Sequence, residues 1–235
     1  MLLKDAWYKM SNYSGGDVNH FINNEIELLP FRYSQGKWQS YNSDDRNLIV
    51  VAEFLRIQKP ICVLECGTFE ARSTEYFTRV MRTSNPNPNK ILVTIDVEGC
   101  ILHMGEEYVT FYDDEGYNES MKIRKARLEL LQCDPFVKVI YREGLTQLLL
   151  PNLLQEFNFD FIYEDASHLT HILKKDWEHI NKFTKENCVV CFDDMAGNEF
   201  KDWLYENAKN WELYYTDLER GQIWAQKIKG EQNDF

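Results

Sequence analysis

Residues 61–74 read Ile-Cys-Val-Leu-Glu-Cys-Gly-Thr-Phe-Glu-Ala-Arg-Ser-Thr, and this stretch decides the fold class. Its first part, 61–65, is a short continuous apolar run, which is typical of a parallel strand buried on both faces. Gly67 follows in a turn, and a helix is predicted near 72–83 with Ser73 at its start. A buried strand, a glycine turn and a helix form the first unit of an α/β fold.

The same alternation of strand and helix continues on both sides of this unit. A helix that begins after Ser43 and ends at Lys59-Pro60 precedes it. Further strands are predicted at 91–95, 136–141, 159–163 and 188–192, and further helices near 119–132, 145–154, 170–183 and 198–209. Segments 211–216 and 222–228 are predicted to form a hairpin through Glu219-Arg-Gly. The fold class is therefore α/β: a doubly wound, mostly parallel seven-stranded sheet with helices on both faces and a C-terminal antiparallel pair.

Two segments fall outside this alternation. Residues 98–117 are expected to be a long acidic loop, which is unusual inside a compact domain. Residues 1–42 are rich in aromatic residues without a clear period and are expected to form an irregular or partly helical appendage to a domain over 43–235. The appendage is expected either to cover a bound acceptor or to form the contact of a homo-oligomer.

Composition limits the classes of partner. The 235 residues carry a formal charge of −12, which argues against nucleic acid as the main partner. No apolar run approaches the roughly 20 residues that cross a bilayer, and residues 1–10 lack the apolar segment of a signal peptide. Three of the six cysteines, at 62, 188 and 191, lie in strand-like runs, as in a reduced, cytoplasmic chain. Cys188 and Cys191 should point to opposite faces of a strand and so should not share a metal ion.

A cofactor site is predicted at the carboxyl ends of the strands, where the strand order reverses. Gly67 would let the backbone pass close to a ligand there, and Asp96, at the end of the second strand, could accept hydrogen bonds from ribose hydroxyls. The alternative for Asp96 is that it caps the following turn. The dinucleotide pattern GxGxxG is absent, which argues against an NAD-dependent oxidoreductase.

Three aspartates follow two strands that are expected to be neighbours. Asp165 follows the strand at 159–163, and Asp193 and Asp194 follow the strand at 188–192. Parallel neighbours lie about 4.8 Å apart, and two like charges about 4 Å apart repel by roughly 4 kcal/mol at an effective dielectric constant of 20. The cluster therefore needs a proton, a base or a cation, and an all-oxygen set favours Mg²⁺ over Ca²⁺ or Mn²⁺. The alternative is that these acids cap helices or face water.

Residues 63–74 resemble motif I of the class I S-adenosylmethionine-dependent methyltransferases, whose pattern is ExGxxxGxS, with Ala71 in place of the last glycine. Residues 143–151 resemble the segment after the third strand in that family, where the residues matching Thr146 and Gln147 lie beside the adenine. The likeness covers about 61–195 and extends to the tail. It implies S-adenosylmethionine as the cofactor, bound by Glu65, Gly67, Thr68, Phe69, Ser73, Asp96, Thr146, Gln147 and Asp165.

The stretch Asp165-Ala-Ser-His168 narrows the resemblance to the metal-dependent O-methyltransferases, and within them to the cephalosporin-hydroxylase-like and macrolide-sugar methyltransferases. Asp176 matches an aspartate inside the following helix of that branch. The resemblance implies that Asp165, Asp193 and Asp194 hold Mg²⁺ and that His168 is the general base. The acceptor would be a hydroxyl of a small molecule: a sugar, a glycosylated metabolite or a vicinal diol. The alternative for His168 is a surface residue that bonds the turn.

Three other functions remain to be compared with this one. A methyltransferase-like module that binds cofactor or partner without turnover is the non-enzyme alternative, supported by Ala71 and the unusual loop at 98–117. An NAD-dependent reductase would leave the three aspartates without a role. Hydroxylation lacks the two histidines and one carboxylate at usable spacing that hold iron.

Overall fold

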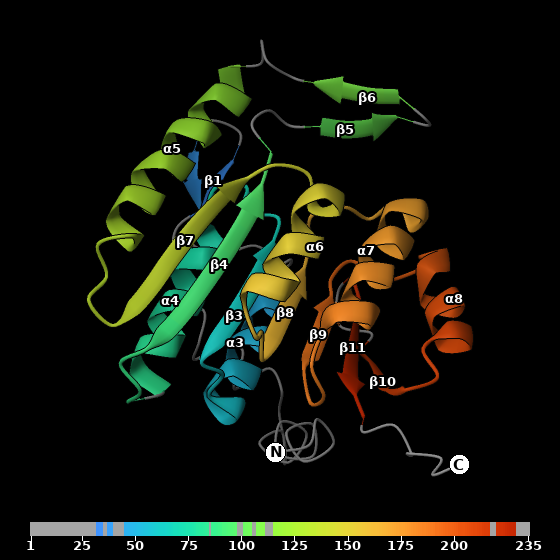
Figure 1. The fold of residues 1–235 in the computed structure, drawn as a ribbon. Helices are drawn as coiled ribbons and strands as arrows, with labels where there is room; N and C mark the ends of the chain where they lie inside the picture. The colour runs from blue at the N-terminus through green and yellow to red at the C-terminus, as the bar shows by residue number, and fades with distance from the viewer. Residues whose placement is uncertain are drawn as a thin grey trace, which may run out of the picture.

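The computed structural model describes residues 45–84, 86–97, 115–216 and 220–228, together with four short strands at 32–34, 37–39, 101–104 and 107–110. Seven strands form the main sheet, in the spatial order β10-β11-β9-β8-β3-β4-β7 (Figure 1). In the main sheet β11 alone runs opposite to the other six strands, so the mostly parallel seven-stranded sheet is confirmed. The strands are β3 (Cys62–Cys66), β4 (Lys90–Asp96), β7 (Val137–Glu143), β8 (Phe161–Glu164), β9 (Val189–Phe192), β10 (Trp211–Thr216) and β11 (Gln222–Lys227).

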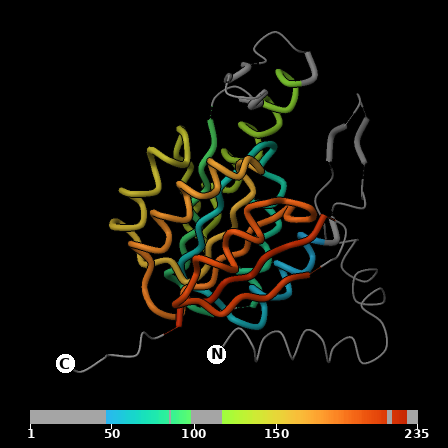
Figure 2. Tube along the Cα trace, turned by 90° about the vertical axis from the view of Figure 1, so that its right-hand side faces the viewer, coloured from blue at the N-terminus to red at the C-terminus, as the bar shows by residue number. Residues whose placement is uncertain are grey.

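Helices cover both faces of the sheet, as predicted (Figures 1 and 2). One face carries α3 (Asp45–Gln58), α4 (Arg72–Ser84) and α5 (Glu115–Leu131), and the other carries α6 (Thr146–Glu156), α7 (Thr170–Phe183) and α8 (Glu199–Asn207). Successive strand residues alternate between the two cores: Val63 packs in the first and Leu64 in the second. Cys188 and Cys191 likewise lie in different cores, so their separation across the sheet is confirmed.

The strand order reverses beside β3. From β3 the chain moves outward to β4 and β7, then crosses back to β8 on the other side of β3 and continues to β9. In open α/β sheets a crevice forms at such a point, outside the carboxyl ends of the strands. The turn after β3 and the ends of β8 and β9 therefore border the same space.

The expectation of a long loop at 98–117 is wrong. β5 (Ile101–Met104) and β6 (Glu107–Thr110) pair as a two-stranded antiparallel sheet, and α5 begins at Glu115. The pairing of Met104 with Glu107 leaves a two-residue connection whose first residue is Gly105, a combination that favours a tight hairpin. In the appendage, β1 (Arg32–Ser34) pairs with β2 (Lys37–Gln39). The rest of residues 1–42 lies outside the described part of the chain, so the predicted roles as cover or interface stay predictions.

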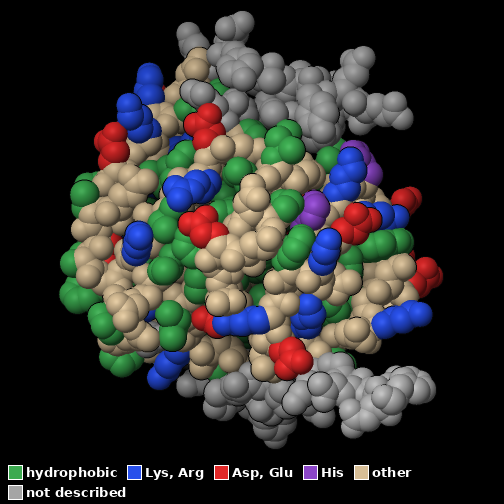
Figure 3. Space-filling model, viewed as in Figure 1, with side chains coloured by type: hydrophobic (Ala, Val, Ile, Leu, Met, Phe, Trp, Pro, Cys, Tyr) green, Lys and Arg blue, Asp and Glu red, His purple; other side chains and the backbone are tan. Residues whose placement is uncertain are grey.

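On the face that carries α6 and α7, the described residues show charges of both signs side by side (Figure 3). Among the helices of the described residues, none is long and apolar enough to cross a membrane.

Candidate active site

The turn after β3 approaches the end of β8 at backbone distance. Gly67 has φ +96°, and a Cβ atom built there would lie 2.6 Å from the carbonyl oxygen of Asp165. The Gly67 N–H donates to the Ile95 carbonyl (2.9 Å), and the Asp165 N–H donates to the Cys66 carbonyl (2.9 Å). Only glycine combines this φ with this contact. Gly67 therefore allows the cofactor-type turn and the acid-bearing loop to share one edge.

The buried carboxyl group of Glu65, in β3, stabilises the turn that begins at Gly67. Glu65 is fully buried and accepts hydrogen bonds through Oε2 from the hydroxyls of Thr74 (2.5 Å) and Thr94 (2.6 Å), and the Thr94 and Thr68 hydroxyls are 2.6 Å apart. Burial raises the pKa of Glu65 to about 7, although hydrogen bonds from Ser73, Thr74 and Thr94 oppose the shift. Glu65 thus anchors the turn from the protein interior.

The turn borders a cavity of about 190 Å³ at the carboxyl edge of β3, β8 and β9. The crevice beside Gly67 is therefore open. It combines the predicted cofactor residues Gly67, Thr68, Phe69, Ser73 and Asp165 with all three predicted metal ligands, of which Asp165 is one. The lining residues are Leu48, Gly67, Thr68, Phe69, Glu70, Arg72, Ser73, Tyr163, Asp165, Asp193, Asp194 and Arg220.

Asp96 lies at the end of β4, across the turn from Glu65. Its Oδ2 accepts the Phe69 N–H (2.5 Å), its Oδ1 accepts the Val97 N–H (2.7 Å), and Arg124 Nη1 lies 3.5 Å from Oδ2. Burial raises the pKa of Asp96, against the lowering effect of these donors. The side chain does cap the turn, as the alternative had it. A carboxylate offers about four lone-pair positions, so it can also accept hydrogen bonds from a ligand.

Thr146 and Gln147 direct their side-chain donors inward. The Thr146 hydroxyl donates to Asp176 Oδ2 (2.8 Å), and Gln147 Nε2 donates to the Thr146 hydroxyl (2.7 Å). Burial raises the pKa of Asp176 to about 7, against the lowering effect of these donors. The start of α6 is therefore tied to α7, and contact with an adenine would use other atoms of these residues.

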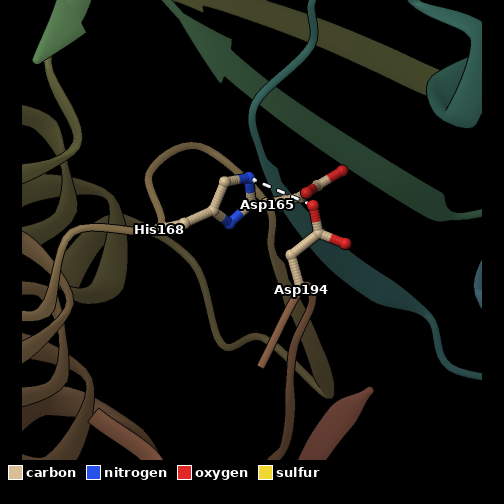
Figure 4. A group of neighbouring side chains, drawn as sticks. All are labelled: Asp165, His168 and Asp194. Carbon is tan, nitrogen blue, oxygen red and sulfur yellow. Dashed lines mark ion pairs between the residues drawn. The ribbon is translucent and has the colours of Figure 1, made fainter. Parts of the chain in front are cut away.

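Asp165, His168 and Asp194 come together at the edge of the cavity (Figure 4). One ligand atom from each lies within 4.8 Å of the other two, and His168 Nε2 is 3.5 Å from Asp194 Oδ2. Burial raises the pKa of Asp165, and the charges of Asp193 and Asp194 raise it further. The group has the spacing and the donor chemistry to hold a divalent ion.

Asp193 differs from the other two aspartates. It is buried, and its carboxylate accepts three hydrogen bonds, from the Tyr163 hydroxyl (2.7 Å), Asn47 Nδ2 (2.7 Å) and Gln222 Nε2 (3.0 Å). Burial and the charge of Asp194 raise its pKa, while these donors lower it. The structure therefore places Asp165 and Asp194 beside His168. Asp193 lies outside this group and, with its buried partners, forms the floor of the same cavity.

Four residues of the site carried no functional assignment from the sequence. Tyr163 stands two residues before Asp165, which places both side chains on one face of the strand, and its hydroxyl is 3.3 Å from Asp165 Oδ2. Arg220 Nη1 donates to Asp194 Oδ2 at 2.7 Å. The others are Asn47 and Gln222. Strand alternation could have indicated Tyr163, because it lies two residues from Asp165. Asn47, Arg220 and Gln222 lie far from the aspartates in the sequence, so no local pattern indicates them.

Comparison with known proteins identifies the fold. No protein-family profile matches the sequence, and no curated protein matches it. Many solved structures do match. A putative caffeoyl-CoA O-methyltransferase from Staphylococcus aureus is 13% identical with a TM-score of 0.55, covering 95% of this chain and 99% of that chain.

Two further matches come from biosynthetic methyltransferases. The calicheamicin methyltransferase CalS11 is 16% identical with a TM-score of 0.57, over 95% of this chain and 90% of its own. The O-methyltransferase TomG from Streptomyces achromogenes, solved with S-adenosylmethionine, is 14% identical with a TM-score of 0.57, over 89% of this chain and 96% of its own. The fold predicted from residues 63–74 is confirmed: it is the fold of the class I S-adenosylmethionine-dependent O-methyltransferases.

Proposed function

We propose that this chain, with its class I methyltransferase fold, is an S-adenosylmethionine-dependent O-methyltransferase that acts on a hydroxyl of a small molecule with the help of a divalent cation. The observation that carries the proposal is one cavity that joins the Gly67 turn to Asp165 and Asp194, with His168 grouped beside these two carboxylates. Methyl transfer to oxygen requires an oriented cofactor and a group that accepts the hydroxyl proton, and a cation-binding cluster within reach of both suits a cation-assisted form of the reaction.

The residues around the turn fit the cofactor. S-adenosylmethionine supplies an electrophilic methyl group on a sulfonium when it is bound. Gly67 leaves the backbone accessible, Ser73 lies at the start of α4 beside the cavity, and Asp96 retains lone pairs for ribose hydroxyls. The Glu65 network holds this turn in one conformation before any ligand arrives, which lowers the entropic cost of binding.

His168 is the proposed general base. Its side chain is 46% exposed at the cavity edge, and Asp194 lies 3.5 Å from Nε2, where it can orient the ring and stabilise the imidazolium. A base in this position removes the proton of an acceptor hydroxyl as the oxygen attacks. Loss of such a group costs about 10²–10⁴-fold in rate.

Asp165 and Asp194 are the proposed cation ligands, with Asp193 supporting them from below. Their oxygens fit a divalent ion by distance and chemistry, and His168 stands beside them outside the ligand set, so that its ring can accept a proton. Mg²⁺ is proposed first, with Ca²⁺ or Mn²⁺ as alternatives. Such an ion, when bound, orients and acidifies an acceptor hydroxyl.

The acceptor is proposed to be a sugar, a glycosylated metabolite or a vicinal diol. Support comes from the polar lining of the cavity and from CalS11, which is described as a TDP-rhamnose 3'-O-methyltransferase. A cytoplasmic location is proposed because the five described cysteines are unpaired, four of them buried.

The test combines binding with turnover. Calorimetry should detect binding of S-adenosylhomocysteine. Incubation of the protein with S-adenosylmethionine and a panel of hydroxylated acceptors should produce S-adenosylhomocysteine and a methylated acceptor. His168→Gln should lose about 10²-fold or more of the turnover while it keeps cofactor binding, and His171→Gln, an exposed histidine of α7, is the matched control. Binding without transfer across a broad panel would favour the non-catalytic module. No binding would refute the proposal, and full turnover in excess EDTA would remove the cation.

A further inference from the structure

Asp194 has a cationic partner in the same chain, the partly exposed side chain of Arg220. Its Oδ2 accepts a hydrogen bond of 2.7 Å from Arg220 Nη1, and His168 Nε2 lies 3.5 Å from the same oxygen. This is the carboxylate that the proposed function assigns to a divalent ion. A guanidinium–carboxylate contact at this distance is a charge-assisted hydrogen bond, about twice as strong as a neutral one.

The backbone holds Arg220 beside Asp194. The Ala196 N–H donates to the Arg220 carbonyl (2.6 Å), and the Met195 N–H donates to the Gly221 carbonyl (3.0 Å). Gly221 has φ +72°, and a Cβ atom there would lie 2.5 Å from the Tyr215 hydroxyl. The segment that follows Asp194 and the segment that carries Arg220 are therefore joined at two points, so the pair does not depend on a chance surface contact.

A dication and the guanidinium cannot both contact Asp194 Oδ2 without strong repulsion. Two positive charges at contact distance repel each other, and the repulsion from a divalent ion is twice that from a single charge. Arg220 also lines the cavity, so its side chain has space to leave Asp194 without leaving the site.

We propose that Arg220 is the resident counter-cation of Asp194, and that a divalent ion binds the Asp165–Asp194 pair only by displacing its guanidinium. Arg220 thereby sets the ion affinity of the site. The proposal rests on the cation of the proposed function and adds a residue that opposes it. Once displaced, the guanidinium points to the cavity from beside the ion.

The test measures Mn²⁺ binding by calorimetry and by electron paramagnetic resonance. Arg220→Gln should tighten the Kd for Mn²⁺ by about tenfold, since the ion no longer breaks a charge-assisted hydrogen bond. Arg220→Lys keeps the charge but loses the planar fork and should tighten it by about threefold. Arg72→Gln removes the same charge from another wall of the cavity and should change the Kd less than Arg220→Gln does.

Three results would overturn the proposal: an unchanged or weaker Kd for Mn²⁺ in Arg220→Gln, equal tightening in Arg72→Gln, or no Mn²⁺ binding by any of the proteins. Thermal unfolding and S-adenosylhomocysteine binding, measured on every variant, separate these results from misfolding. Intact cofactor binding with an unchanged Kd defeats the role of Arg220 alone, whereas loss of cofactor binding in the unaltered protein defeats the proposed function. If Arg220→Gln does not fold, an unchanged Kd in Arg220→Lys overturns the proposal.

Discussion

Strand β8 has an aspartate at each end, and the two carboxylates have opposite surroundings. Asp160, before the strand, accepts the N–H groups of Ile61 (2.8 Å) and Cys62 (2.9 Å) and the Lys185 ammonium (2.7 Å). Asp165, after the strand, lies near the charges of Asp193 and Asp194. One sheet thus carries an acid bonded by backbone N–H groups and a cation at one edge, and an acid beside two like charges at the other.

The difference follows from strand direction. Parallel strands present free N–H groups at their amino edge and free carbonyl groups at their carboxyl edge. An acid at the first edge is therefore bonded by backbone, whereas an acid at the second edge needs a proton, a side-chain donor or a cation. Asp165, Asp193 and Asp194 accept their hydrogen bonds from side chains, whereas Asp96, at the end of β4, accepts the N–H groups of Phe69 and Val97. The carboxyl edge of β8 and β9 is suited to chemistry because side chains that can move, and not the backbone, hold its acids.

The largest change in stability is expected at Gly67, where the backbone lies against the backbone of Asp165. Gly67→Ala should lower the free energy of unfolding by about 3–5 kcal/mol, because it adds a backbone collision to an unfavourable φ. Gly197 also has positive φ (+69°) but nothing within 4 Å of a built Cβ. Gly197→Ala should therefore cost only about 1 kcal/mol. Urea unfolding measures both, and equal costs would contradict the steric account.

The second-largest effect is expected in the pH dependence of the free energy of unfolding, through the buried carboxyl group of Glu65. The pKa of Glu65 is about 7 in the folded state and near 4.5 when unfolded. The folded state therefore binds more protons between these values, and stability falls as pH rises from about 4.5 to 7, by about 3 kcal/mol for this group. Glu65→Gln should remove that part of the fall in urea unfolding at pH 5 and pH 8. Asp176, with a pKa also about 7, remains as an internal reference. A wild-type stability that rises over this range would contradict the assignment.

The direct comparison of the two edges is the pair Asp160→Asn and Asp165→Asn. The first weakens the pairing with Lys185 and two backbone donors, and should lower the free energy of unfolding by about 1–3 kcal/mol. The second relieves repulsion, so at pH 8 stability should stay constant or rise by up to about 1 kcal/mol, while Mn²⁺ binding is lost. Thermal unfolding and calorimetry measure the two responses. If both variants were destabilised to a similar extent, the proposed difference between the amino edge and the carboxyl edge of β8 would be wrong.

The smallest effect is expected at Ala71, which takes the position of the family glycine. Its φ of +58° lies in the left-handed region. Ala71→Gly should relieve about 1 kcal/mol of backbone strain in the folded state. Because glycine also raises the conformational entropy of the unfolded chain, the free energy of unfolding should rise by only about 0 to 1 kcal/mol. A matched Ala166→Gly substitution in the adjoining loop gives the unfolded-state cost alone. A loss at Ala71 as large as that at Ala166 would mean that no strain is stored there.

Much of the fold was predictable because the buried strands carry their own signal. The runs at 61–65 and 91–95 are continuous and apolar, which is typical of strands buried on both faces. The first is followed directly by α4, whose apolar residues lie on one buried face. The hairpin of β5 and β6 was missed because its two strands have only four residues each and mix polar with apolar side chains. The Gly105 turn between them was the signal that could have found it.

The site was only half predictable, for a different reason. Residues at strand ends, such as Asp165 and Asp194, are placed by local sequence and strand order together. The partners that distinguish Asp193 from Asp194 come from α3, β11 and the turn before β11, and no local pattern indicates that Asn47 or Arg220 will reach these acids. Hydrogen bonds between distant segments decide which aspartate remains available to a ligand.

The floor of the cavity also joins the beginning and the end of the domain. Asn47 and Gln222 are 175 positions apart, yet Gln222 Nε2 donates to the Asn47 carbonyl (3.2 Å) and both side chains donate to Asp193. A growing polypeptide cannot complete this junction until its last strand has left the ribosome. Contacts of such long sequence separation form slowly. The cavity should therefore become complete only after the strands that precede β11 have been made.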